Sequence, residues 1–266
     1  MELPTLFSTL IVIFLGLIVV FVFFKKDRLE SSKKNKRNAN DDIPYLIVHE
    51  LRSPITAIKN SAETLISGKS VLTNTEKKQF LELIYQQSKL LLEQIQLIMD
   101  VAKLDAGKLT ITKTQGNMGE FISQQTKIFL LSAKKKNISL NVEIEDTPII
   151  SFDPIHIGQV LNNLISNSLK FTQEGGKIYV KVGMSNPTAN YVTVSVADTG
   201  RGIPKDFQKR LFSKFSQSPE TPQEIAKQGT GLGLYLTKGI IDAHKGTINV
   251  ESEEGKGTTI SFNLPI

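Results

Sequence analysis

Three amide side chains and a lysine share one face of a predicted helix in DPIHIGQVLNNLISNSLKFT (153–172). Asp153 is the predicted N-cap residue, and Pro154 occupies the first turn. At about 100° per residue, the amides and the lysine lie on the side opposite the apolar residues. The three amides are Gln159, Asn163 and Asn167, and the lysine is Lys170. Amide oxygens suit Mg²⁺ and a lysine suits phosphate. The face therefore predicts a metal–phosphate site; the alternative is a solvated, asparagine-rich surface.

A carboxylate follows a strand-like run in ADTGRGIP (197–204). Asp198 stands at the predicted strand end, where it could accept a hydrogen bond from an exocyclic amine. Gly200 and Gly202 would let the backbone approach a flat ring closely. A plain Asp-Gly turn is the alternative interpretation.

Three glycines alternate with other residues in GTGLGL (229–234), before and at the start of a predicted helix. Backbone amides beside the positive end of a helix form an anion site, so Gly229, Gly231 and Gly233 are candidates for phosphate binding. The run lacks the lysine of a Walker A loop and the spacing of a dinucleotide fingerprint. The polar segment 203–228 is predicted to be a lid hinged by these glycines.

A histidine and an acid are adjacent in YLIVHELRSPITAI (45–58). The neutral imidazole of His49 would be a competent nucleophile at pH 7. Glu50 could accept the other ring N–H and stabilise the ring as it becomes cationic. Pro54 leaves a helix carbonyl without its donor, so we expect a kink one turn after His49.

Two long amphipathic helices are predicted around the histidine. Apolar residues recur at helical spacing from 42 to 67, and again from 74 to 105. Thr73 and Glu76 fit a capping box at the start of the second helix. A hairpin alone leaves apolar stripes uncovered, so we expect a homodimer with a four-helix bundle. The alternative is that the hairpin packs on the C-terminal domain.

Alternating apolar residues predict a mixed α/β domain after the hairpin. Strands are expected at 108–113, 138–144, 176–182, 191–198, 246–252 and 257–264, with helices around 118–135, 154–170 and 232–244. Mixed strands and helices of this kind indicate an α+β or α/β two-layer domain, and we expect a two-layer α/β sandwich.

Composition excludes several classes of site. The 266 residues include no cysteine and three histidines, so zinc–thiolate and histidine-rich metal sites are not expected. His156 is predicted to lie at the surface and His244 to cap helix carbonyls. The net charge is +6, of which +5 falls between Lys25 and Arg37. The remaining chain is nearly neutral, so nucleic acid is not an expected partner.

The N-terminal segment is predicted to be a single transmembrane helix. Residues 6–24 carry no charge and as a helix would span roughly 28 Å. A signal peptide is the alternative, but the segment lacks a basic n-region and a small-residue cleavage site. The lysines and arginines that follow place residues 25–266 in the cytoplasm, which predicts a single-pass protein of the cytoplasmic membrane with lipid contact through this helix.

Together, the motifs resemble those of sensor histidine kinases of two-component systems. NNLISNSLKF is similar to the N box of that family, DTGRGIP to the G1 box, LFSKFSQ to the F box, GTGLGL to the G2 box and VHELRSPI to the H box. The resemblance covers about residues 42–266 and implies a dimerisation and phosphotransfer hairpin (42–106) and a Bergerat-type ATP-binding domain (107–266). With the predicted transmembrane helix (1–24) and a basic juxtamembrane linker (25–41), the chain has four expected parts.

The resemblance also assigns roles to residues. His49 aligns with the phosphorylated histidine, Glu50 with the acid that assists transfer, and Ser53 with a position that orients water for phosphatase action. The ATP-binding positions are Asn163, Asn167, Lys170, Asp198, Gly200, Gly202, Gly229, Gly231, Gly233 and Thr258. Asn167 is the expected ligand of Mg²⁺, Lys170 would face the phosphates, and Asp198 would bind the adenine amine.

The implied activity is ATP-dependent autophosphorylation of His49, followed by transfer to an aspartate in the receiver domain of a separate response regulator. Ser53 is smaller than the usual phosphatase residue, which leaves phosphatase activity open. With no predicted extracellular domain, the stimulus would come from the span or from a membrane sensory partner. Two other classes remain open: a membrane-anchored adaptor that signals by binding, and an ATPase of the wider gyrase, chaperone and mismatch-repair superfamily.

Overall fold

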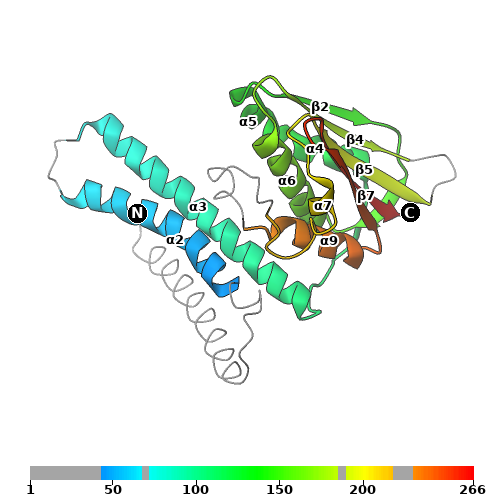
Figure 1. Cartoon of the computed structure of the whole chain (residues 1–266), viewed down its shortest axis with the longest axis horizontal. Helices are drawn as coiled ribbons and strands as arrows, with labels where there is room; N and C mark the ends of the chain where they lie inside the picture. The colour runs from blue at the N-terminus through cyan, green and yellow to red at the C-terminus, as the bar shows by residue number, and fades with distance from the viewer. Residues whose placement is uncertain (1–42, 68–71, 185–189, 218–229) are drawn as a thin grey trace. The chain divides into compact units, whose positions relative to one another are not determined.

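A computed structural model describes residues 43–67, 72–184, 190–217 and 230–266 (Figure 1). The chain forms two compact units, Met1–Arg52 and Ser53–Ile266. The predicted span and basic linker, residues 1–41, lie outside the described residues, as does Gly229. None of the helices in the described part is long and apolar enough to cross a bilayer.

Two long helices form the N-terminal part of the described chain, as predicted. Helix α2 (Ile43–Ser67) continues through Pro54, and the kink expected there stays a prediction. Helix α3 (Asn74–Asp105) begins with the predicted capping box: Thr73 Oγ1 accepts from the Glu76 N–H at 3.2 Å, and Glu76 accepts from the Thr73 N–H at 2.8 Å. The box satisfies amides that would otherwise lack partners at the helix start.

The C-terminal domain is built on a five-stranded sheet with the order β2-β4-β5-β7-β6. Its strands are β2 (Ser139–Ile144), β4 (Lys177–Gly183), β5 (Tyr191–Asp198), β6 (Thr247–Glu253) and β7 (Gly257–Pro265). The β2–β4 pair is parallel and the other neighbours are antiparallel. All five strands were predicted, because their alternating apolar residues match the two-residue period of a strand.

One face of the sheet is covered by helices, which makes the predicted two-layer sandwich (Figure 1). The covering helices include α4 (Met118–Thr126), α5 (Leu130–Lys135), α6 (Pro154–Phe171) and α9 (Gly233–Ala243). The apolar side of α6 is buried as expected; its residues Ile157, Val160, Leu161, Leu164 and Ile165 are at most 2% exposed. Each such side chain contributes about 1.5–3 kcal/mol when fully buried. This packing turns the amide face of α6 away from the core.

The strand predicted at 108–113 was wrong. The first strand is β1 (Thr114–Asn117), which pairs with β3 (Ile149–Phe152) in a separate two-stranded sheet. The Thr112 N–H instead donates to Asp153 Oδ2 at 2.7 Å, so the preceding segment is bonded to a helix cap rather than to a neighbouring strand. The helical region predicted at 118–135 is divided into α4, a 3₁₀ turn η1 (Lys127–Phe129) and α5. A short helix α7 (Lys205–Gln208) was not predicted.

Candidate functional site

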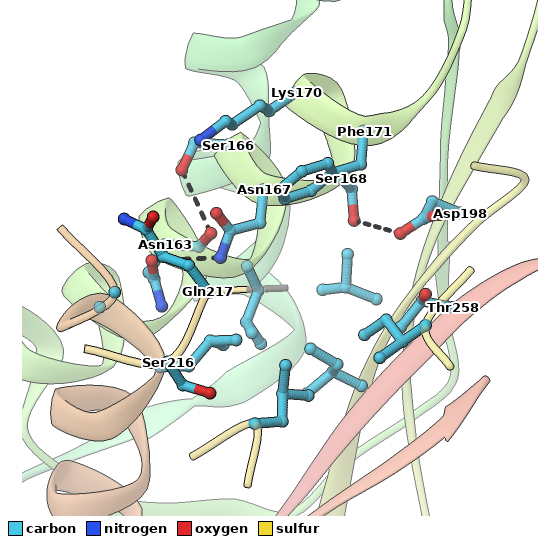
Figure 2. Close-up of a pocket in the computed structure, with 18 of the residues that line it drawn as sticks. Asn163, Ser166, Asn167, Ser168, Lys170, Phe171, Asp198, Ser216, Gln217 and Thr258 are labelled. Atoms are coloured by element: carbon cyan, nitrogen blue, oxygen red, sulfur yellow. Dashed lines mark hydrogen bonds between the residues drawn. The ribbon is translucent and has the colours of Figure 1, made fainter. Parts of the chain in front are cut away.

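Eight of the predicted ATP-site residues line a cavity of about 360 Å³ (Figure 2), whereas Gly200 is not part of its lining. Helix α6, the end of β5, the start of α9 and strand β7 each contribute to its lining. The predicted residues that line it are Asn163, Asn167, Lys170, Asp198, Gly202, Gly231, Gly233 and Thr258. Motifs up to 95 residues apart in the chain therefore meet at a single cavity.

The amides of α6 are oriented by a chain of hydrogen bonds. Asn163 donates from Nδ2 to Thr237 Oγ1 on α9 at 2.8 Å. Asn167 in turn donates from Nδ2 to Asn163 Oδ1 at 3.3 Å (Figure 2). Because the Asn167 nitrogen is used in this bond, its carbonyl oxygen is the atom left for a hard cation, as Mg²⁺ coordination requires.

Asp198 is held at the end of β5 by hydrogen bonds to both carboxylate oxygens. Ser168 Oγ donates to Oδ2 at 3.0 Å, and the Gly200 N–H donates to Oδ1 at 2.9 Å. Burial raises the pKa of the Asp198 carboxyl, although hydrogen bonds from Gly200, Ser168 and the Thr258 backbone act in the opposite direction. A half-buried acceptor positioned in this way can recognise an amine on a flat ring.

Two glycines are required by the shape of the site. Gly202 has φ of +71°, and a Cβ there would lie 2.1 Å from the Glu253 carbonyl oxygen. Gly233 allows close approach: a Cβ there would lie 2.3 Å from Asn163 Oδ1. A side chain at either position would displace the turn or the amide pair.

The remaining predicted ATP-site residues lie beside these groups. The Lys170 ammonium is 5.2 Å from the centre of the Phe171 ring, and the Arg201 guanidinium is 5.1 Å from the same centre. Both cations line the cavity, so it can accept a negatively charged ligand. Thr258 Oγ1 is 2.9 Å from Ser252 Oγ, which fixes its hydroxyl at the cavity wall.

The predicted phosphotransfer residues lie on another element, helix α2. His49, Glu50 and Ser53 are within one and a half turns of each other on this helix. Ser53 is exposed. Their roles stay predictions.

The other two histidines belong to a structural cluster at the N-terminus of α6. His244 caps a helix carbonyl as predicted, with Nδ1 2.8 Å from the Ile240 carbonyl oxygen, and its Nε2 also accepts the Asp153 N–H at 3.0 Å. Burial lowers the pKa of His244. His156, which was predicted at the surface, is half-buried, and its Nδ1 lies 2.9 Å from Asp153 Oδ2.

Several residues of the site were not predicted from the sequence. Thr237, which orients Asn163, follows the glycine run without any distinguishing pattern. Ser168 lies inside the N box and could have been proposed as a partner for a carboxylate. Three further lining residues come from the hairpin helix α3: Leu90, Gln94 and Leu97.

Helix α3 also contacts the C-terminal domain near its own end. Asp105 accepts a hydrogen bond from the Tyr235 hydroxyl at 2.8 Å and pairs with Lys214 of the F box. Burial raises the pKa of the Tyr235 phenol, and the hydrogen bond to Asp105 raises it further. Asp100, five residues earlier on α3, accepts from Gln159 Nε2 of α6 at 3.1 Å. The hairpin and the cavity are therefore directly linked within this unit.

The sequence matches two described families. Residues 46–107 match the His Kinase A (phospho-acceptor) domain, and residues 152–266 match the histidine kinase-, DNA gyrase B- and HSP90-like ATPase. The chain is 33% identical over 229 residues to the sensor histidine kinase TmoS of Ectopseudomonas mendocina, an alignment that covers 86% of this chain and 23% of TmoS. It thus spans less than a quarter of that relative's length.

Solved structures of histidine kinases have the same fold. Full-length ShkA in complex with AMPPNP matches with a TM-score of 0.62 and 26% identity, over 85% of this chain and 45% of ShkA. The histidine kinase ThkA in complex with the response regulator protein TrrA matches with a TM-score of 0.58 and 27% identity, over 82% of this chain and 59% of that chain.

Proposed function

The chain belongs to the sensor histidine kinases, which are ATP-dependent enzymes of two-component signalling, and we propose from this that it phosphorylates its own His49 with ATP and passes the phosphoryl group to a response regulator. The observation that carries the proposal is the cavity that joins the oriented amide pair of α6 to the half-buried carboxylate of Asp198. This arrangement matches the two ends of ATP, one metal-bound and anionic, the other a flat ring with an amine.

Each group in the cavity has a defined part in holding the nucleotide. The Asp198 carboxylate accepts a hydrogen bond from the adenine amine, and its bonds to Ser168 and Gly200 hold it in position. The Asn167 carbonyl would hold Mg²⁺, which offsets charge on the triphosphate when bound. Lys170 lies on the same face of α6, one turn further on, and faces the phosphates.

The transfer step takes place between this nucleotide and His49. An imidazole nitrogen forms a P–N bond to the γ-phosphorus as the P–O bond to the β-phosphate breaks, and ADP leaves. Glu50 accepts a hydrogen bond from the N–H of the other ring nitrogen, which fixes the tautomer and stabilises the ring as it becomes cationic. The phosphoryl group then passes to an aspartate carboxylate in a receiver domain. The ThkA–TrrA complex supports a response regulator as the partner.

We further propose that the active form is a dimer. Large apolar side chains on α2 and α3 remain exposed, among them Ile66 at 83%, Leu92 at 62% and Leu81 at 59%. Burying such residues against a second hairpin in a four-helix bundle would stabilise the dimer by the hydrophobic effect. The match to the phospho-acceptor domain supports the same arrangement.

Membrane attachment and phosphatase activity are also proposals. The uncharged run 6–24, followed by the basic residues 25–37, supports a single-pass anchor with the catalytic part in the cytoplasm. A membrane partner or the span itself would then supply the stimulus. Ser53, exposed one turn after His49, would orient water for dephosphorylation of the regulator.

The test is autophosphorylation of the full chain with γ-labelled ATP and Mg²⁺. We expect label that is acid-labile and base-stable in the wild type and absent in His49→Gln. Asn167→Ala should also lose the label, whereas Asn162→Ala, an exposed amide on the same helix, should keep it. Wild-type protein without such label refutes the kinase proposal. ATP turnover that survives His49→Gln would favour an ATPase, and nucleotide binding without turnover would favour an adaptor.

A further inference from the structure

Two buried polar atoms at the nucleotide cavity lack hydrogen-bond partners among the described residues. They are Oε1 of Gln94 on α3 and Oγ of Ser216 after α7, and both residues line the cavity. A buried acceptor without a partner is costly, so such groups in native proteins commonly have a ligand or water as their partner. Gln94 is the more informative of the two because it belongs to the hairpin rather than to the ATP-binding domain.

Gln94 lies on the face of α3 that is turned toward the cavity. Leu90, Gln94 and Leu97 are spaced by four and three residues, which places them on one side of the helix, and all three line the cavity. An amide therefore interrupts an otherwise apolar stripe. Packing alone would favour a third apolar residue at this position.

Gln94 and the amide pair of α6 line the same cavity from two different helices. Asp100 on α3 contacts Gln159 on α6. The cavity-lining residues of α3 come before Asp100 in the chain, whereas those of α6 come after Gln159. The two helices therefore pass the cavity in opposite directions. Gln94 is six residues, about 9 Å, before Asp100. A point about 9 Å after Gln159 along α6 lies between Asn163 and Asn167, on the metal–phosphate side of the cavity.

We propose that Gln94 is a nucleotide-contacting residue supplied by the phospho-acceptor hairpin, and that its side-chain amide hydrogen-bonds the metal–triphosphate end of bound ATP. The amide oxygen can accept from a metal-bound water, and the amide nitrogen can donate to a phosphate oxygen. The proposal rests on the proposed function of the cavity as the ATP site. It means that the ATP-binding domain completes its nucleotide contacts only when α3 is in place.

The experiment compares Gln94→Leu with Gln86→Leu, an exposed glutamine on the same helix, in the purified full chain. Calorimetric titration with AMPPNP and Mg²⁺ gives the Kd, and displacement of AMPPNP by adenosine gives the affinity of the base end. We expect Gln94→Leu to raise the Kd for AMPPNP roughly three- to tenfold, as loss of one hydrogen bond does. Adenosine affinity should not change, and Gln86→Leu should match the wild type for both ligands.

The thermal stability of the ligand-free protein separates contact with nucleotide from a structural role. Replacing a partnerless amide by an apolar side chain of similar size should leave the Tm unchanged or raise it. An unchanged Kd for AMPPNP, equal weakening of adenosine, or a lowered Tm would each overturn the proposal. Asp198→Asn tests the cavity itself: it should weaken both ligands, and unchanged binding of both would refute the ATP site rather than the role of Gln94.

Discussion

Gly233→Ala tests the oriented amide pair directly. Gly233 begins α9, and a Cβ there would lie 2.3 Å from Oδ1 and 2.9 Å from Cγ of Asn163. The Asn163 side chain is held between Thr237 at 2.8 Å and Asn167 at 3.3 Å, so it cannot move aside without breaking these bonds. We expect the added methyl group to displace Asn163 and leave the Asn167 amide unoriented.

Two opposing effects set the magnitude. Each hydrogen bond contributes about 0.5–1.5 kcal/mol, so loss of both costs about 1–3 kcal/mol of folding free energy. Alanine is a better helix former than glycine by up to about 1 kcal/mol, which offsets part of this loss. No such offset applies to nucleotide binding. Loss of the bond that orients Asn167 should therefore raise the Kd for AMPPNP roughly two- to tenfold, with only a modest change in Tm.

The assay is calorimetric titration with AMPPNP and Mg²⁺, with thermal unfolding as the stability measurement. Gly158→Ala is the matched control, because the nearest atom to a Cβ at this α6 position is 3.7 Å away. A Kd for Gly233→Ala equal to that of the control refutes the reasoning. A double-mutant cycle gives a second check: in an Asn163→Ala background the clash is absent, so Gly233→Ala should have little further effect.

Three further predictions concern other parts of the molecule. The unfolding free energy of the wild type should fall as pH drops below 6.5. Burial lowers the pKa of His244 in the folded protein, so the unfolded chain takes up this proton first, and protonation in the folded protein would break the bond from the Asp153 N–H. Urea melts of His244→Gln at pH 7.5 and 5.5 should show a smaller difference than those of the wild type. Asp105→Asn should lower the pKa of Tyr235, measured by ultraviolet titration against a Tyr235→Phe reference, and an unchanged titration would contradict the observed hydrogen bond. Pro54→Ala supplies a backbone N–H to α2 about one turn after the phospho-acceptor position. We expect it to change the steady-state level of phosphohistidine under the labelling conditions above. An unchanged level would show that the proline has only a structural role.

Local patterns in the sequence were sufficient for most of the secondary structure. The five strands of the main sheet and helices α3, α6 and α9 follow from hydrophobic periods, and Thr73 and Asp153 were recognisable as caps. The amide face of α6 could be predicted because helical geometry alone sets the angle between its residues. Segment 108–113 was assigned incorrectly, because its alternating apolar residues do not reveal that the Thr112 amide bonds to a distant carboxylate.

Sequence motifs also identified most of the cavity, but not the contacts that orient its side chains. Asn163 is oriented by Thr237, 74 positions away, and Asp198 by Ser168, 30 positions away. Neither pairing leaves a period or spacing in the chain. Such contacts depend on how α6, α9 and β5 pack, and the packing is set by many apolar residues together rather than by any one motif.

The sequence by itself therefore singled out the candidate residues: a histidine beside an acid on one helix, and amides, a carboxylate and glycines in the predicted ATP-binding domain. Only the tertiary structure decided how they are held and that Gln94 of the hairpin lines the same cavity. The physical reason is that chemical type and local period belong to the residue and its near neighbours. Orientation, burial and pKa instead arise from long-range contacts that exist only once the chain is folded.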